Sequence, residues 1–129
     1  MTNRSKAKGS AWERAIVEYL RAAGWPFAER RLAGSAKDRG DIAGVVGVVI
    51  EAKNTASRKL AEWIEETETE RVNDDAWLGV VWHKRTGKAS AADGYVTMTG
   101  AQFTALLARA LDIQPPLPDE PDREAVTAS

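Results

Sequence analysis

The sequence of 129 residues contains no cysteine and a single histidine, His83. The absence of cysteine excludes disulfide bonds and metal sites built from thiolates. No apolar run approaches the roughly 20 residues that a membrane-spanning helix requires, and no signal-peptide core follows the start. We therefore expect a protein of the cytoplasm, without membrane segments, that is large enough to form one hydrophobic core.

The net charge of -1 conceals an uneven distribution of charge along the chain. Lysine and arginine outnumber aspartate and glutamate in residues 1–60, whereas acidic residues dominate residues 61–75. A basic region is typical of proteins that bind a polyanion, and an acidic helix is most simply a solvated face. The charge pattern thus indicates one polyanion-facing side, without identifying the partner.

Composition divides the chain into three parts. Residues 1–9 are polar and basic, and we expect a flexible arm in which Arg4, Lys6 and Lys8 could reach a phosphate backbone; a flexible end that only aids solubility is the alternative. Residues 10–111 carry the periodic apolar pattern of a folded domain. Residues 112–129 are rich in proline and acidic side chains, and we expect them to be disordered.

Helix and strand signals alternate along the domain. We expect helices in residues 10–23, 57–73 and 99–111, and strands in residues 25–32, on both sides of a hairpin within 39–53, in 76–83 and in 95–98. Ser10 with Glu13, and Thr99 with Gln102, match the capping-box pattern, and Ser57 is a candidate N-cap. This order predicts an α/β sandwich in which a central mixed β-sheet is flanked by helices.

Helical spacing also predicts which side chains face the core. For the acidic helix these are Leu60, Trp63, Ile64, Thr67, Arg71 and Val72, and for the last helix Phe103, Leu106, Leu107 and Leu111.

The segment 39–53, RGDIAGVVGVVIEAK, combines an apolar run with charged side chains at its two ends. Its glycines suit a turn, and a hairpin folded about the middle would place Asp41 opposite Glu51. Glu51 and Lys53 share one face, because side chains two residues apart on a strand point the same way. Two carboxylates and an ammonium would then meet, and either Lys53 or a divalent metal ion would offset the repulsion. The alternative is a salt-bridge cluster without catalysis.

Donors suited to phosphate precede and follow this segment. The first group ends in a loop of small and basic residues that runs into Asp41, and the second follows the 76–83 strand. The candidate DNA contacts are Arg30, Arg31, Ser35, Lys37, Arg39, Lys84, Arg85 and Lys88. An ordinary polar connection is the alternative for the loop.

Four groups of residues together resemble the PD-(D/E)xK nuclease superfamily. They are Gly9-Ser10-x-x-Glu13-Arg14, Arg31-x-x-x-Ser35, Gly40-Asp41-Ile42 and Ile50-Glu51-Ala52-Lys53. The chain is most similar to the archaeal-type Holliday junction resolvases and to small resolvase-like nucleases of phage genomes, over about residues 9–100. It departs from them at Gly40, where the family has proline, and in the short interval between Asp41 and Glu51.

The resemblance implies a restriction-endonuclease-like three-layer sandwich and a Mg²⁺-dependent endodeoxyribonuclease, with Mn²⁺ as a substitute ion. It implies Glu13, Asp41, Glu51 and Lys53 as catalytic residues, with Asp41, Glu51, the Ala52 carbonyl and Glu13 as metal ligands. Lys53 would orient the attacking water or stabilise developing charge.

The implied partner is DNA with a four-way or other branch, cut to leave a 5′-phosphate. Symmetrical cutting of such a junction requires two active sites, so a homodimer is also implied, in the bacterial host cytoplasm if a phage encodes the chain. A nicking, flap or repair endonuclease of the same fold, and a DNA-binding protein without activity, are the alternatives.

Overall fold

Apolar side chains at helical and strand spacing organise residues 3–31 and 40–114, the parts of the chain that the computed structural model describes. The helices are α1 (Asn3–Ala23), α2 (Leu60–Asn73), the 3-10 helix η1 (Ala91–Asp93) and α3 (Gly100–Ala110). The strands are β1 (Glu29–Arg30), β2 (Ile42–Ala43), β3 (Val48–Lys53), β4 (Leu78–His83) and β5 (Tyr95–Thr97). The predicted order of the main helices and strands is confirmed.

The five strands form one mixed sheet in the order β1-β2-β3-β4-β5. The first three strands pair antiparallel, β3 and β4 pair parallel, and β5 returns antiparallel to β4. The parallel pair requires a crossover, and α2 provides it. Because β3 and β4 run in the same direction, their carboxyl ends, at Lys53 and His83, lie side by side in the register.

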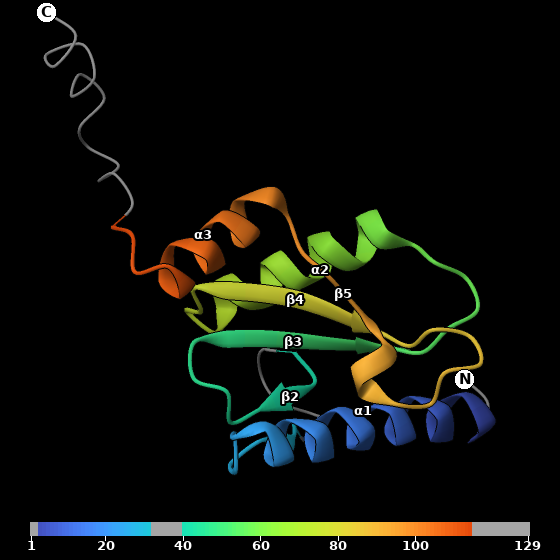
Figure 1. Ribbon diagram of the computed structural model, residues 1–129. Coiled ribbons are helices and arrows are strands. Elements are labelled where there is room, and N and C mark those ends of the chain that lie inside the picture. The colour runs from blue at the N-terminus through green and yellow to red at the C-terminus, as the bar shows by residue number, and fades with distance from the viewer. Residues whose placement is uncertain (1–2, 32–39, 115–129) are drawn as a thin grey trace, which may run out of the picture.

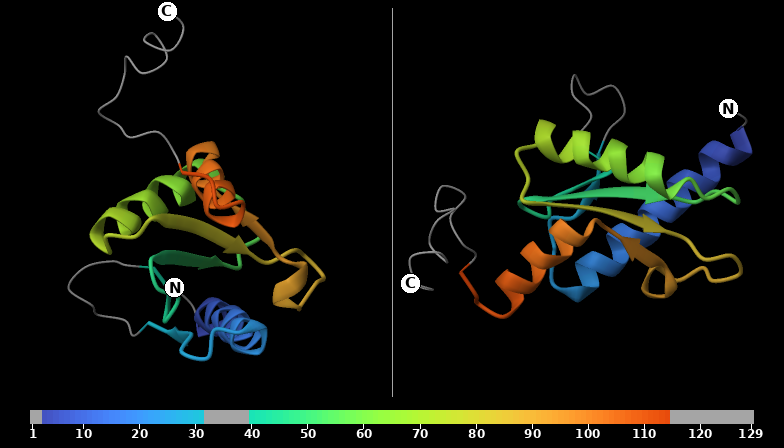
Figure 2. Two further views of the ribbon diagram at one scale, coloured as in Figure 1. Left: turned by 60° about the vertical axis from the view of Figure 1, so that its left-hand side comes forward. Right: turned by 90° about the horizontal axis from the view of Figure 1, so that it is seen from above.

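The sheet is covered by helices on both faces. One face carries the main hydrophobic cluster, in which Trp12 and Ile16 of α1 pack with Ile50 and Val80 of the sheet. Leu106 of α3 packs against the same cluster. The view from above in Figure 2 shows α2 and α3 on opposite sides of β4. The molecule is therefore an α/β domain with a flanked mixed sheet, which is the predicted class (Figure 1).

Helix α1 begins at Asn3, well before the predicted start at Ser10. The capping box at Ser10 and Glu13 is therefore wrong, because both residues lie inside the helix. Within the expected arm of residues 1–9, the structure places residues 3–9 in α1, which they continue toward the amino terminus. Arginine, lysine and alanine in this stretch are good helix formers, which accounts for the longer helix.

The two other predicted helix starts have different outcomes. Thr99 is the N-cap of α3, as predicted, and its hydroxyl accepts a hydrogen bond from the Gln102 backbone N–H at 3.1 Å. The Gln102 side chain does not complete a capping box, because its Oε1 accepts from the Gly79 N–H at 3.0 Å. Ser57 is not the N-cap of α2, because the helix begins at Leu60 with Lys59 as an N-cap that makes no side-chain hydrogen bond.

The predicted inner faces are only partly correct. Phe103, Leu107 and Leu111, expected to face the core, are 50%, 41% and 63% exposed and form a stripe on the surface. The buried residues of α2 are Trp63 and Thr67, as predicted, and also Glu70, which was not predicted.

Two expectations concern residues that the structure describes incompletely. The expected disordered tail, residues 112–129, lies outside the described residues from position 115 onward, and the loop 33–39 lies outside them entirely. In the part of the chain that is described, no helix has the length and apolar character needed to cross a membrane.

Candidate functional site

The β2–β3 hairpin brings Asp41 to the carboxyl-terminal half of β3. Ile42 pairs with Ile50, and Asp41, directly before β2, lies beside residues 50–52 of β3. The Asp41 N–H donates to the Ile50 carbonyl at 3.0 Å, and the Ala52 N–H donates to Asp41 Oδ2 at 2.9 Å. The carboxylate thus takes the place of a backbone acceptor beside β3, which fixes its position.

Two glycines make this hairpin possible. Gly44 and Gly47 have φ angles of +90° and +79°, which side chains of L-residues rarely allow. A Cβ atom at position 44 would also lie 1.9 Å from the Phe27 carbonyl oxygen. The turn residues therefore determine how closely the strands approach and where Asp41 ends up.

Lys53 lies between two carboxylates that come from different elements. Its Nζ is 3.5 Å from Glu51 Oε1 on the same strand and 3.4 Å from Glu66 Oε2 on α2. Burial opposes the charged form, but these two carboxylates prevail and raise the pKa of Lys53 above its ordinary value of 10.5. Lys53 is therefore an ammonium ion at neutral pH, suited to orient a polar group or stabilise negative charge.

Three acidic side chains form a cluster between the sheet and α2. Glu51, Glu66 and Glu70 offer oxygen atoms that all lie within 4.8 Å of one another. Glu51 is 5% exposed and Glu70 is 1% exposed, whereas Glu66 lies nearer to solvent. We call these three residues the acidic cluster.

Glu51 has a strongly raised pKa in this cluster. Burial, a hydrogen bond with Glu70 and the charge of Asp41 raise its pKa far above the ordinary value of 4.5, while Lys53 acts in the opposite direction. Keeping these carboxylates ionised together is unfavourable unless a cation joins them. An all-oxygen donor set of this kind fits a hard divalent ion, so the acidic cluster could hold a metal ion.

Sequence reasoning missed two members of the cluster, Glu66 and Glu70. The acidic block was interpreted as a solvated face, although Glu70 follows Trp63 and Thr67 at helical spacing on the same buried stripe. Extending that stripe by one step would have found Glu70. Glu66 could be assigned only once α2 was placed over Lys53.

Glu13 lies on the other side of the sheet. Its Oε1 accepts a hydrogen bond from Arg30 Nε at 2.9 Å, and Arg30 also donates to Ser10 Oγ at 3.0 Å. Arg30 pairs in register with Ile42, which packs in the α1 cluster, whereas Glu51 faces α2. The structure therefore does not bring Glu13 into the acidic cluster, and its catalytic and metal-binding roles stay predictions.

The predicted DNA contacts are found at several places. Arg30 forms an ion pair with Glu13. The neighbouring Arg31 has a buried side-chain Nε without a hydrogen-bond partner among the described residues. The backbone N–H of Arg31 donates to the Asp41 carbonyl at 2.8 Å. Lys84 follows β4 directly, Arg85 lies 4.9 Å from the centre of the Tyr95 ring, and Lys88 is exposed. Ser35, Lys37 and Arg39 lie outside the described residues.

His83 is a buried neighbour of the site. It pairs in register with Lys53, and its Nε2 lies 2.8 Å from Thr97 Oγ1. Burial and, secondarily, the charge of Arg58 lower the pKa of His83 below 6.5, so the ring is neutral at pH 7. The aromatic side chains of Trp63 and Tyr95 pack beside it, which is the environment of a structural histidine.

The fold and the site define a class: an α/β domain with a mixed sheet, an ordered hairpin carrying Asp41, Glu51 and Lys53, and an acidic cluster that could hold a metal ion. Comparison with known proteins adds no relative, because neither the family models nor the curated proteins nor the solved structures give a match.

Proposed function

We propose that the chain is a metal-dependent endodeoxyribonuclease with a restriction-endonuclease-like fold that cuts branched DNA, as a Holliday junction resolvase does. The observation that carries this proposal is the convergence of Asp41, Glu51 and Lys53 at the end of one hairpin. Burial and neighbouring acids make the ionised form of Glu51 energetically unfavourable. A bound divalent cation would offset this cost of ionisation.

Asp41 and Glu51 are the proposed Mg²⁺ ligands, together with the Ala52 carbonyl, and Mn²⁺ would substitute. Glu66 and Glu70 adjoin this set through the acidic cluster. When bound, the ion would neutralise the phosphodiester and lower the pKa of the attacking water. Asp41 is already oriented for such a role by its hydrogen bond with the Ala52 N–H.

Lys53 has a separate role in the proposed mechanism. Because Glu51 and Glu66 keep it charged, it holds a water or phosphate oxygen by donating hydrogen bonds and stabilises the charge that develops on the phosphate. It does not act as the general base, since its proton is retained at neutral pH. Arg31, beside Asp41, is a donor for the same phosphate or the next one.

The proposed substrate has two-fold symmetry, which requires two copies of the site. We therefore propose a homodimer, and the surface stripe of Phe103, Leu107 and Leu111 on and after α3 is the apolar face that a second copy would cover. Recognition would follow the shape of the DNA more than its base sequence, because no helix of the described residues has the features of a major-groove reader.

Cleavage of a four-way junction, a flap and a linear duplex in Mg²⁺ tests the proposal. Paired symmetrical nicks confined to the junction support a resolvase, and preferred cutting of the flap or duplex supports the alternative endonuclease. We expect Asp41→Asn and Glu51→Gln to keep junction binding and to lose cleavage by at least about 100-fold, as expected when a group that stabilises the transition state is removed.

Glu65→Gln is the matched control, because Glu65 is an exposed acid on α2 outside the acidic cluster. It should cut at the wild-type rate. Wild-type cleavage by Asp41→Asn or Glu51→Gln would remove the proposed site. Tight DNA binding without cleavage by the wild-type protein in either ion would favour a DNA-binding protein without activity.

A further inference from the structure

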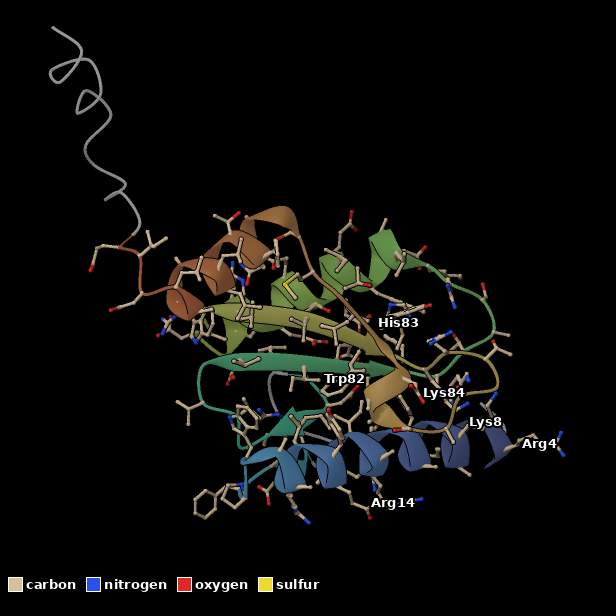
Figure 3. The ribbon with its side chains drawn as sticks, in the orientation of Figure 1. Arg4, Lys8, Arg14, Trp82, His83 and Lys84 are labelled. Atoms are coloured by element: carbon tan, nitrogen blue, oxygen red, sulfur yellow. The ribbon has the colours of Figure 1, made fainter. Side chains whose placement is uncertain are left out.

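Three basic side chains line the edge of the molecule at which β3 and β4 end. Arg4 and Lys8 belong to the first turns of α1, and Lys84 follows β4. Figure 3 shows all three on the side of the molecule where the strand arrows end, whereas Arg14, farther along α1, projects away from the sheet. We call Arg4, Lys8 and Lys84 the basic ridge.

The geometry of α1 gives the ridge a regular spacing. Arg4 and Lys8 are four residues apart, so they share one face of the helix and lie about 6 Å apart along its axis. Both are exposed, and no ion pair engages either of them or Lys84 among the described residues. Two adjacent cations without a protein partner are suited to successive phosphates of one strand.

Backbone contacts fix the ridge relative to the hairpin site. The Asn54 side-chain amide donates to the Lys8 carbonyl at 3.3 Å, which ties α1 to the residue after Lys53. The Lys84 N–H donates to the Lys53 carbonyl at 3.0 Å. One turn beyond Lys8, Trp12 Nε1 donates to the Trp82 carbonyl at 3.0 Å and anchors the helix on β4. The ridge is therefore held on ordered elements that meet beside Lys53.

We propose that the basic ridge binds the phosphates of a duplex DNA arm that leads away from the cut site. This inference rests on the proposed nuclease function and adds to it a surface that the hairpin residues do not form. Arg4 and Lys8 contact one strand, and Lys84, next to Lys53, contacts the backbone closer to the reacting phosphate. The enzyme consequently requires helical DNA next to the cut, and a short single strand would not occupy the ridge.

The test compares two double variants that remove the same charge from the same helix. Arg4→Ala with Lys8→Ala removes the ridge positions, whereas Arg14→Ala with Arg21→Ala removes two exposed cations of α1 that the ridge does not include. Binding of a labelled duplex is measured by fluorescence anisotropy at several salt concentrations with EDTA present, which prevents cleavage. Circular dichroism reports whether α1 remains helical in both variants.

We expect the ridge variant to lower the slope of log affinity against log salt by about 1.8, since each phosphate contact contributes about 0.9. The control variant should keep the wild-type slope. In Mg²⁺ the ridge variant should raise KM for a duplex-flanked substrate and leave kcat unchanged, because it does not touch the reacting atoms. An equal decrease of the salt-dependence slope in both variants, or no decrease in either, would contradict the proposal that the basic ridge binds DNA.

The outcome also separates the ridge from the nuclease proposal. A wild-type protein that cuts DNA while the ridge variant keeps its slope and KM contradicts the ridge alone. A wild-type protein that neither binds nor cuts DNA contradicts both.

Discussion

Glu51 should make the metal-free protein less stable as the pH rises. Its pKa is raised by burial first, and then by Glu70 and Asp41, above the ordinary value of 4.5 that it regains in the unfolded chain. Between these two pKa values the native state keeps a proton that the unfolded state has released. Stability decreases with pH wherever the native state binds more protons, so this contribution is present at low pH and is lost as the pH rises.

The size of the effect follows from the slope for one proton, about 1.4 kcal/mol per pH unit. His83 and Lys53 do not titrate between pH 7 and 9, because the pKa of His83 is below 6.5 and that of Lys53 is above 10.5. Over these two units the free energy of unfolding should fall by up to about 2.7 kcal/mol. The full value applies only if Glu51 stays protonated throughout, so it is an upper limit.

Urea unfolding in EDTA at pH 7, 8 and 9, followed by tryptophan fluorescence, measures this slope. Trp12 and Trp63 are buried and report on both faces of the sheet. Glu51→Gln should abolish most of the slope, and Glu65→Gln, an exposed acid on α2, should retain it. Equal slopes in the wild type and Glu51→Gln would refute the reasoning.

Addition of Mg²⁺ provides a second reading of the same site. An ion that binds only the native state stabilises it by about 1.4 kcal/mol at ten times its dissociation constant. Because the ion must displace the proton of Glu51, the stabilisation should increase from pH 7 to pH 9 in the wild type and be lost in Glu51→Gln. Stabilisation of Glu51→Gln to the wild-type extent would place the bound ion elsewhere.

Two further predictions concern the turn and the surface of α3. Gly44→Ala should lower the thermal stability more than Gly87→Ala does. Both glycines have a positive φ, at which a side chain costs about 1–3 kcal/mol of strain. A Cβ at position 44 would also collide with the Phe27 carbonyl, whereas a Cβ at position 87 would meet no atom within 4 Å. Equal losses of stability in the two variants would contradict the close approach at Gly44. Leu107→Glu should weaken dimer formation in sedimentation experiments, and Ala101→Glu, on another part of the same helix, should not. A wild-type protein that stays monomeric at all concentrations would contradict the dimer.

The local parts of the site could be predicted from the sequence. Glycines at the turn and β-forming residues on either side specify the hairpin, and the hairpin alone brings Asp41 beside Glu51. The Thr99 cap was predicted for the same reason, because the capping hydrogen bond joins residues only three apart.

The remaining parts depend on which helix covers which face. Strand β3 is apolar on both faces, since Val49 and Ile50 are both buried, so alternation could not show which face α1 would cover. Glu13 was expected near Glu51 because the resemblance implied it, and in the structure it pairs with Arg30. The start of α1 was misjudged because a capping signal at Ser10 was given more weight than the helix-forming residues before it.

The position of α2 has a consequence for the order in which the site is assembled. Asp41, Glu51 and Lys53 are neighbours as soon as the hairpin forms, but Glu66 and Glu70 arrive only when the crossover helix closes on the sheet. A chain emerging from the ribosome would thus lack two of the three acidic side chains of the acidic cluster until α2 and β4 have docked.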